Sequence, residues 1–202
     1  MEWKEYKERI IYALDSFTYD QEIPFILQNS IQENQRIFIA GNGGSAAIAN
    51  HFFCDLSKGA NSNWKENKER YRVISLSSNL SYISAIANDE SYDEIFKQQL
   101  INLAKPNDIL ILISSSGNSP NIVKAAEYGQ ELGMITVGIS GFQGGKLMEI
   151  CQYNAHIDTD LYEIAEDIHS VFGHFLAVYL REQGKRLRDE SYNDKIGVQP
   201  IR

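Results

Sequence analysis

Two patterns in the spacing of apolar residues indicate which parts of the chain are strands and which are helices. Short runs rich in β-branched and aliphatic residues occupy residues 36–40, 72–76, 108–113 and 134–139, with a weaker fifth run at 153–157. Each of the first four is followed by a segment with apolar residues at helical spacing. Strands that alternate with helices form a parallel sheet with right-handed crossovers. The pattern therefore predicts an α/β protein with a parallel five-stranded sheet flanked by helices, a flavodoxin-like three-layer sandwich.

Helical spacing also marks the first part of the chain. Apolar residues from Ile10 to Phe17 and from Ile23 to Ile31 follow the period of a helix. Asp20 lies between the two segments and is a suitable residue to cap the second helix. We therefore expect an N-terminal helical hairpin over residues 1–34.

A third helical pattern occupies the end of the chain. Residues 160–184 contain apolar residues over a surface wide enough to face both the sheet and a partner subunit. Residues 186–202 are polar, and we expect them to form a flexible tail. A single domain would then span residues 1–185, including the N-terminal hairpin.

Two loops rich in small residues follow the first and third predicted strands. Residues 41–45 read Gly-Asn-Gly-Gly-Ser, and residues 114–119 read Ser-Ser-Ser-Gly-Asn-Ser. The free N–H groups at the start of a helix bind anions, and serine hydroxyls add donors. The loops lack the P-loop lysine and the third glycine of the dinucleotide fingerprint. Because carboxyl ends of parallel strands share one edge of a sheet, the loops predict one site for a sugar phosphate.

Composition and charge narrow the class of protein further. The chain has 202 residues and a net charge of −8 without a basic block, which favours one acidic domain and argues against a nucleic-acid surface. We see no signal peptide and no apolar run of membrane length, so we expect a cytoplasmic protein that does not bind membranes. Cys54 and Cys151 are too few for a disulfide framework or a four-cysteine zinc site.

Four motifs occur in a fixed order along the chain. They are Gly-Asn-Gly-Gly-Ser at 41–45 with His51 after it, Ala-Asn-Asp at 87–89, Ser-Ser-Ser-Gly-Asn-Ser-Pro at 114–120, and Gly-Gly-Lys-Leu at 144–147. Together they closely resemble the SIS (sugar isomerase) domain, and within it the phosphoheptose isomerases, over about residues 5–184. These enzymes convert sedoheptulose 7-phosphate to D-glycero-D-manno-heptose 7-phosphate.

The resemblance implies an aldose–ketose isomerase, which is an intramolecular oxidoreductase. It also implies a homotetramer with interfacial active sites, a zinc ion near the sugar and an enediol mechanism. From the resemblance and the loops we predict that the substrate-binding residues are Asn42, Gly43, Gly44, Ser45, Asp55, Asn88, Asp89, Ser114, Ser115, Ser116, Ser119 and Glu166. Without the resemblance, Asn88 and Asp89 could equally be a turn that ends a helix.

The metal-binding positions depart from the family's usual residues. The family has a His followed four residues later by a Glu, and a Gln followed eight residues later by a His; here these positions are His51, Asp55, Glu166 and His174. We predict that all four bind Zn²⁺ or another divalent metal. Asp55 and His174 are the predicted proton-transfer residues.

Glu166 and His174 lie far apart for two ligands of the same metal ion. Eight residues of helix separate Glu166 from His174 by roughly 12 Å, which is close to the limit at which both could contact one ion. If the two residues came from different subunits, this limit would not apply. His169 is an alternative partner for Glu166, in a Glu-x-x-His pair. The simpler alternative is that Asp55 is an exposed carboxylate and His174 a core residue.

Two alternatives to a phosphoheptose isomerase stay open. One is a metal-dependent isomerase of a different phosphosugar, which Asp55 and Glu166 make plausible. The other is a non-catalytic SIS protein, either a sugar-phosphate sensor or a partner of the replication initiator. A binding module needs neither a metal nor a base, so His51 and His174 favour the enzyme.

Overall fold

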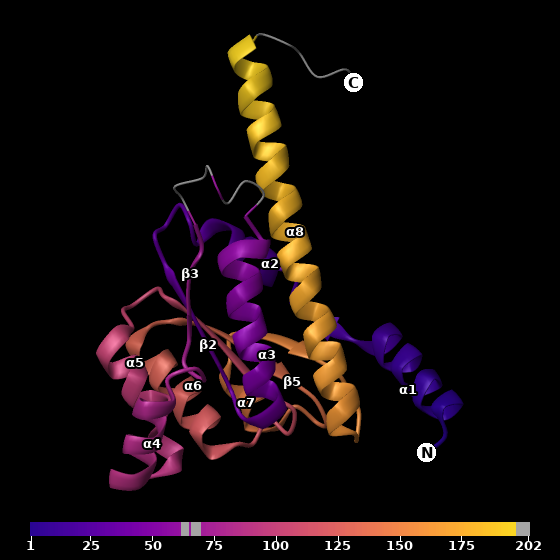
Figure 1. Ribbon diagram of the computed structural model, residues 1–202, viewed down its shortest axis with the longest axis vertical. Helices are drawn as coiled ribbons and strands as arrows, with labels where there is room; N and C mark the ends of the chain where they lie inside the picture. The colour runs from indigo at the N-terminus through magenta and orange to yellow at the C-terminus, as the bar shows by residue number, and fades with distance from the viewer. Residues whose placement is uncertain (62–64, 66–69, 197–202) are drawn as a thin grey trace.

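The computed structural model describes residues 1–61, 65 and 70–196, and a twisted sheet runs through the centre of the molecule (Figure 1). Five of its strands are parallel, as the apolar runs predict, and a two-residue antiparallel strand adds a sixth at one edge. The order is β1-β6-β5-β4-β2-β3, so the parallel strands have the flavodoxin-like order. The strands are β1 (Thr18–Tyr19), β2 (Arg36–Gly41), β3 (Arg72–Ser75), β4 (Ile109–Ser114), β5 (Ile135–Ser140) and β6 (Tyr153–His156).

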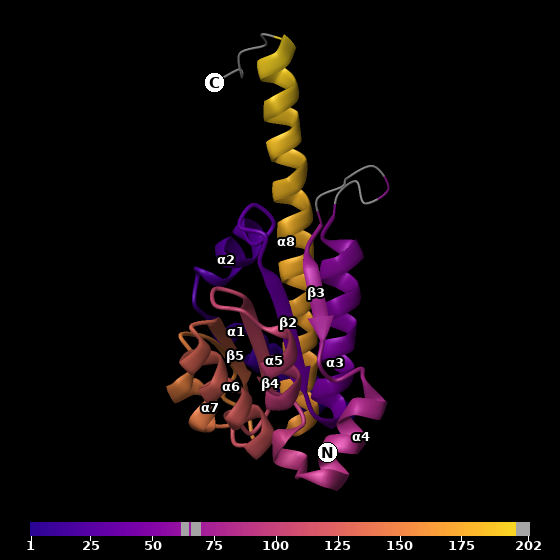
Figure 2. The same cartoon turned by 90° about the vertical axis from the view of Figure 1, so that its left-hand side faces the viewer.

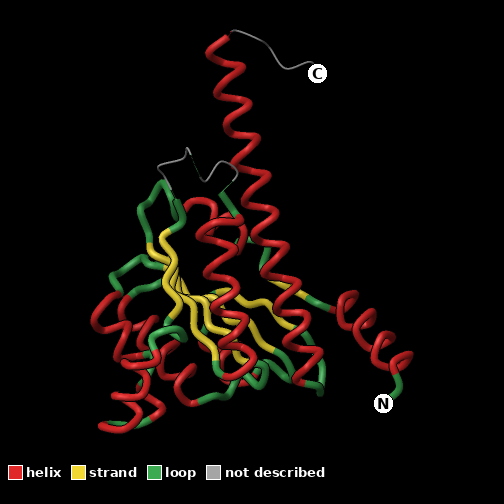
Figure 3. Tube along the Cα trace, in the orientation of Figure 1, coloured by secondary structure: helices red, strands yellow, loops and turns green. Residues whose placement is uncertain are grey.

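Helices cover both faces of the sheet and make three layers (Figure 3). Because successive side chains of a strand point to opposite faces, Ile37 and Ile39 of β2 pack with α2, α3 and α8, whereas Phe38 and Ala40 pack with α4 to α7. The helices are α1 (Trp3–Ser16), α2 (Ile23–Asn29), α3 (Gly43–Cys54), α4 (Leu80–Asp89), α5 (Lys97–Leu103), α6 (Pro120–Leu132), α7 (Gly145–Ile150) and α8 (Tyr162–Ile196). No helix in these described ranges is long and apolar enough to cross a membrane.

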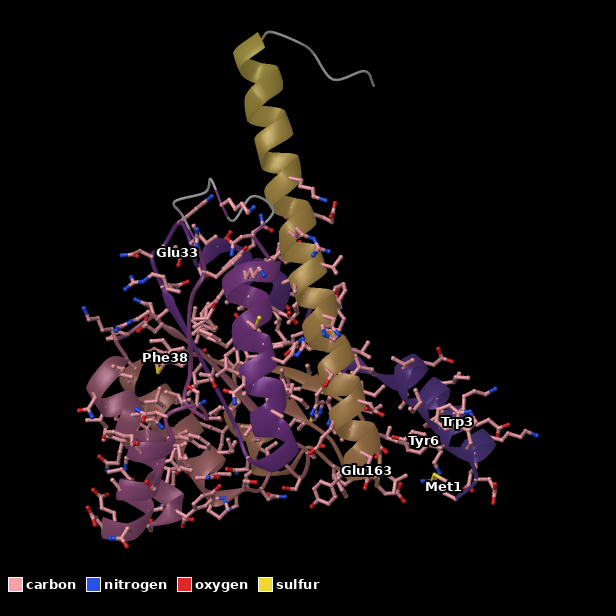
Figure 4. All side chains as sticks on the ribbon, viewed as in Figure 1. Met1, Trp3, Tyr6, Glu33, Phe38 and Glu163 are labelled. Atoms are coloured by element: carbon pink, nitrogen blue, oxygen red, sulfur yellow. The ribbon has the colours of Figure 1, made fainter. Side chains whose placement is uncertain are left out.

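The N-terminal helices do not form the expected hairpin. Strand β1 lies between them and pairs with β6, so α2 joins the layer of α3 and α8 while α1 projects from the body (Figure 1). Helix α1 contacts the first half of α8, where Tyr6 donates a hydrogen bond to Asp167 at 2.9 Å. Figure 4 shows Tyr6 and Glu163 at this junction, with Trp3 further out on α1. The spacing of apolar residues therefore identified α1 and α2 as helices, but not the elements against which they pack.

Helix α8 is longer than its apolar pattern. It continues from Tyr162 to Ile196, so the first part of the predicted flexible tail is helical and extends beyond the rest of the molecule (Figure 2). Residues 197–202 of that predicted tail lie outside the described residues. The polar composition that predicted a tail is also typical of a solvent-exposed helix.

Helices α3 and α8 lie side by side, and one glycine permits their close approach. A Cβ atom at Gly173 of α8 would overlap the ring of Phe52 on α3, so only glycine fits. The neighbours of these two residues are His174 and His51. The close contact between the helices therefore brings the two histidines together.

Candidate active site

Three predicted residues form a cluster between α3 and α8. His51 Nε2 lies 3.1 Å from His174 Nε2 and 3.3 Å from Asp55 Oδ2, and His174 Nε2 lies 3.7 Å from the same oxygen. His51 is in the last turn of α3, and Asp55 begins the π-helical turn that follows at Asp55–Gly59. The four-residue spacing puts both on one side of the helix, facing His174 of α8.

The cluster has the donor set and the spacing of a metal site. The three side chains offer ligand atoms that all lie within 4.8 Å of one another. Two ligands of a tetrahedral zinc ion, each about 2 Å from it, are roughly 3.3 Å apart. Asp55 Oδ2 is buried and makes no conventional hydrogen bond to the described part of the chain. A divalent cation between these atoms would satisfy all three residues.

Glu166 is not part of this cluster. It lines a second pocket together with Ser45, Ser114, Ser116 and Tyr162. Three of the four predicted metal ligands therefore lie together within one chain, and Glu166 lies apart from them, eight residues from His174 along α8. A metal site with all four ligands stays a prediction that requires Glu166 and the cluster to come from different subunits.

The second pocket lies where β2 and β4 end and their loops begin. These neighbouring strands run to helices on opposite faces of the sheet, and such a switch point is where open α/β sheets bind ligands. Ser114 donates a hydrogen bond to Ser119 at 3.3 Å, and the Ser115 hydroxyl is buried without a partner among the described residues. All four predicted serines and Ser45 line the pocket. Unpaired donors of this kind suit an oxyanion.

The Gly-Gly-Lys-Leu motif at 144–147 packs against the backbone of the serine loop. Gly117 has φ +65°, and a side chain there would collide with the backbone of Gly144. The Gly117 carbonyl accepts a hydrogen bond from the Leu147 N–H at 2.9 Å. A side chain at Gly145 would likewise overlap the backbone of Ser116 and Gly117, so glycine at 117 and 145 lets the two backbones approach closely.

The glycine-rich loop is held in a different way. The side chains of Asn42 and Asn121 exchange hydrogen bonds of 2.8 and 2.9 Å, and Tyr92 donates one to Asn42 at 3.1 Å. Asn42 also lines the serine pocket. The sequence alone did not indicate Asn121 or Tyr92, because neither belongs to a loop motif. Both are far from Asn42 along the chain, so no local pattern predicts that they contact it.

Two predicted substrate residues lie apart from both pockets. Asn88 and Asp89 are exposed at the end of α4, where Asn88 donates a hydrogen bond to Asp89 at 2.8 Å. Neither lines the pockets formed by the described residues of this chain. Their position agrees with the alternative that they end a helix.

His169 is a core residue rather than a partner of Glu166. Its side chain is fully buried, and its ring lies near the backbone of Ser140 without a hydrogen bond of good geometry to the described residues. Burial lowers the pKa of His169 to about 4, so the ring is neutral near pH 7. The imidazole therefore belongs to the packing beneath the site.

Comparisons with known proteins place this geometry in a family. The family model of the SIS domain matches residues 23–141. A probable phosphoheptose isomerase of Thermoplasma acidophilum is 33% identical over 157 residues, which are 78% of this chain and 84% of that protein. Phosphoheptose isomerase 1 of Campylobacter jejuni is 32% identical over 182 residues, or 90% of this chain and 95% of its own.

Solved structures share the fold. The phosphoheptose isomerase GmhA of Neisseria gonorrhoeae superposes with a TM-score of 0.72 at 24% identity, covering 80% of this chain and 84% of that one. A phosphoheptose isomerase of Francisella tularensis gives 0.71 at 24% identity, covering 80% and 83%. The chain belongs to the SIS domain family and, within it, to the phosphoheptose isomerases, which are aldose–ketose isomerases.

Proposed function

We propose that this protein isomerises a phosphosugar, with sedoheptulose 7-phosphate as substrate and D-glycero-D-manno-heptose 7-phosphate as product. The observation that carries the proposal is the pairing of two sites along the contact of α3 with α8. A pocket rich in hydroxyl donors lies at one end, and a His–Asp–His cluster lies at the other. The names of the sequence relatives agree with a phosphoheptose substrate.

The separation of the sites suits the length of the substrate. At a rise of about 1.5 Å per residue, Ser45 and His51 are about 9 Å apart along α3. An extended chain advances about 1.2 Å per bond, so the seven bonds from C2 of a heptulose to its phosphorus span about 8 Å. The phosphate would occupy the serine pocket while the carbonyl carbon lies near the cluster.

The cluster contains the groups that the chemistry needs. His51, Asp55 and His174 would hold Zn²⁺ or another divalent cation, which when bound polarises the carbonyl and stabilises negative charge on its oxygen. Ketose and aldose interconvert when a base removes a proton from C1 and a proton is returned to C2 of the resulting enediol. We assign these proton transfers to His174 and Asp55. The serine hydroxyls hold the phosphate throughout.

We further propose that the enzyme is a homotetramer with active sites at subunit interfaces. The side chains of His51 and His174 are 62% and 57% exposed to solvent. An active site that excludes water needs its reacting groups to be more deeply covered than this. Phe53, Val171 and Phe175 are exposed on the same two helices. A partner subunit that covers these apolar side chains would also close the cluster.

A second candidate is an isomerase of a different phosphosugar. The specific observation in its favour is Glu166, whose carboxylate lies in the serine pocket where the family has an uncharged Gln. The two candidates share the reaction and the phosphate site. They differ in the sugar.

The test is a panel of ketose phosphates that differ in chain length, incubated with metal-analysed protein and followed by NMR. We expect conversion of sedoheptulose 7-phosphate to the aldose to be fastest. Faster conversion of another ketose phosphate would select the second candidate. No conversion of any member by the metal-loaded protein would contradict both.

A further inference from the structure

Asn42 stands at the N-terminus of α3 and lines the serine pocket, but its side chain does not cap the helix. An asparagine in this position usually accepts a hydrogen bond from an N–H group of the first turn through its side-chain oxygen. Within the described chain, the Asn42 oxygen instead accepts hydrogen bonds from the Asn121 amide at 2.9 Å and from the Tyr92 hydroxyl at 3.1 Å. Asn42 therefore leaves the N–H groups at the start of α3 uncapped.

These contacts determine which atom of Asn42 can meet a ligand. A side-chain carbonyl oxygen has two lone pairs, and the bonds from Tyr92 and Asn121 use both. The amide nitrogen of Asn42 donates one of its two hydrogens to the Asn121 oxygen at 2.8 Å. The three bonds thus leave one N–H of Asn42 for a ligand. A group that can only donate suits an oxyanion, which an exposed carbonyl oxygen would oppose.

Helix α6 places both partners of Asn42. Asn121 lies in its first turn and is 1% exposed, so its amide is a buried polar group that the exchange with Asn42 satisfies. Lys124 lies one turn further along α6, and its ammonium group pairs with the Glu94 carboxylate at 2.8 Å. Glu94 ends the short 3₁₀ helix that Tyr92 begins. The same helix therefore provides Asn121 and holds the segment that carries Tyr92.

We propose that Asn121 and Tyr92 are positioning residues of the phosphate site, which hold the Asn42 amide so that its N–H meets the phosphate and its carbonyl oxygen does not. This rests on the proposed function in placing the phosphate in the serine pocket. Without the two partners the Asn42 amide can rotate, and its oxygen then either meets the anion or caps α3. Both changes weaken anion binding. Because the phosphate itself does not react, the loss belongs in KM and not in kcat.

The experiment measures the affinity of the whole protein for inorganic phosphate by calorimetry, and KM and kcat with sedoheptulose 7-phosphate. Tyr92→Phe removes only the hydroxyl, whereas Asn121→Leu keeps the size of the side chain and removes its hydrogen bonds. The matched control is Tyr82→Phe, because the Tyr82 hydroxyl donates to the Gln98 carbonyl at 3.3 Å and neither residue is among the described ones that line the pocket. Asn42→Ala, alone and combined with Tyr92→Phe, completes a double-mutant cycle.

We expect the affinity for phosphate to fall about threefold in Tyr92→Phe and about tenfold in Asn121→Leu. KM should rise by the same factors while kcat stays within about twofold of wild type. Asn42→Ala should lower the affinity about tenfold. In the Asn42→Ala background, Tyr92→Phe should cause no further loss, because the hydroxyl acts through Asn42. Tyr82→Phe should match wild type.

Wild-type affinity for phosphate in Tyr92→Phe would overturn the proposal, even if Asn121→Leu failed to fold. The same loss from Tyr92→Phe with and without Asn42→Ala would also overturn it, because the hydroxyl would then not act through Asn42. Either result leaves the proposed function in place. If Ser116→Ala with Ser119→Ala leaves phosphate binding unchanged, the phosphate binds elsewhere, and the phosphate assignment of the proposed function fails together with this inference.

Discussion

At the scale of single residues, His51, Asp55 and His174 make a definite prediction about metal binding. Each supplies one atom to the cluster, so removal of any one leaves two ligands. We expect His51→Ala to lower the affinity for Zn²⁺ by about 100-fold or more, measured by competition with a chelator. His156→Ala, which removes a histidine outside the cluster, is the control. Unchanged zinc affinity in His51→Ala would contradict the assignment.

His169 predicts how stability depends on pH. Its pKa is lowered to about 4 in the folded protein, whereas an unfolded chain has about 6.5. The unfolded state therefore binds more protons, and stability is lost as the pH falls from about 6.5 towards 4, by up to about 3 kcal/mol. His169→Leu should remove this component.

The measurement is the free energy of unfolding in urea at pH 7 and at about pH 4.5. Wild type should lose more stability between the two than His169→Leu does. Parallel losses in wild type and His169→Leu would show that His169 is not the titrating group.

The residues of the site were predictable to different degrees. Serines in the loop after β4 could be placed because a strand followed by a helix start fixes where the loop lies. His51 and Asp55 share a helix face, which spacing alone reveals. The separation of Glu166 from His174 into two pockets was not resolved, since periodicity gives the face of a helix and not what lies opposite it.

At the scale of elements, the contact of α3 with α8 depends on Gly173. We expect Gly173→Ala to push the helices apart, because its methyl group would meet the Phe52 ring. Overpacking of this kind costs about 1–3 kcal/mol, partly offset by the better helix propensity of Ala, about 1 kcal/mol. The displacement of His174 from His51 should also lower zinc affinity.

A double variant provides the control for this prediction. Phe52→Leu makes room for the methyl group, so Gly173→Ala combined with Phe52→Leu should recover part of the zinc affinity lost by Gly173→Ala alone. Thermal unfolding and zinc titration measure the two effects. Wild-type zinc affinity in Gly173→Ala would mean that the glycine does not set the distance between the histidines.

The elements themselves followed largely from sequence. Continuous apolar runs gave all five parallel strands, since both faces of this sheet are covered by helices. Strand β1 has only two residues and no such run, so it was not predicted. The absence of the N-terminal hairpin follows from it, because the pairing of β1 with β6 holds α1 and α2 apart.

At the scale of the whole molecule, α1 is the strongest reason to expect an oligomer. It projects from the body with Trp3 and Tyr12 exposed by 74% and 69%. Apolar surface of this extent is typical of protein interfaces. We expect a homotetramer by light scattering, and a smaller species when Trp3→Ser and Tyr12→Ser are combined. A stable wild-type monomer at micromolar concentration would contradict both the tetramer and the interfacial site.

The central claim is that one site holds a phosphosugar by its phosphate and isomerises it at the His–Asp–His cluster. His174→Ala tests it most directly, because His174 belongs to the cluster and the serine pocket is untouched. Lys185→Ala, at an exposed pair with Glu182 on the same helix, is the matched control.

The measurement is turnover of sedoheptulose 7-phosphate by NMR, alongside substrate binding by calorimetry. Our account predicts that His174→Ala loses turnover by at least about 100-fold yet still binds the substrate, while Lys185→Ala matches wild type. Wild-type turnover in His174→Ala would contradict it.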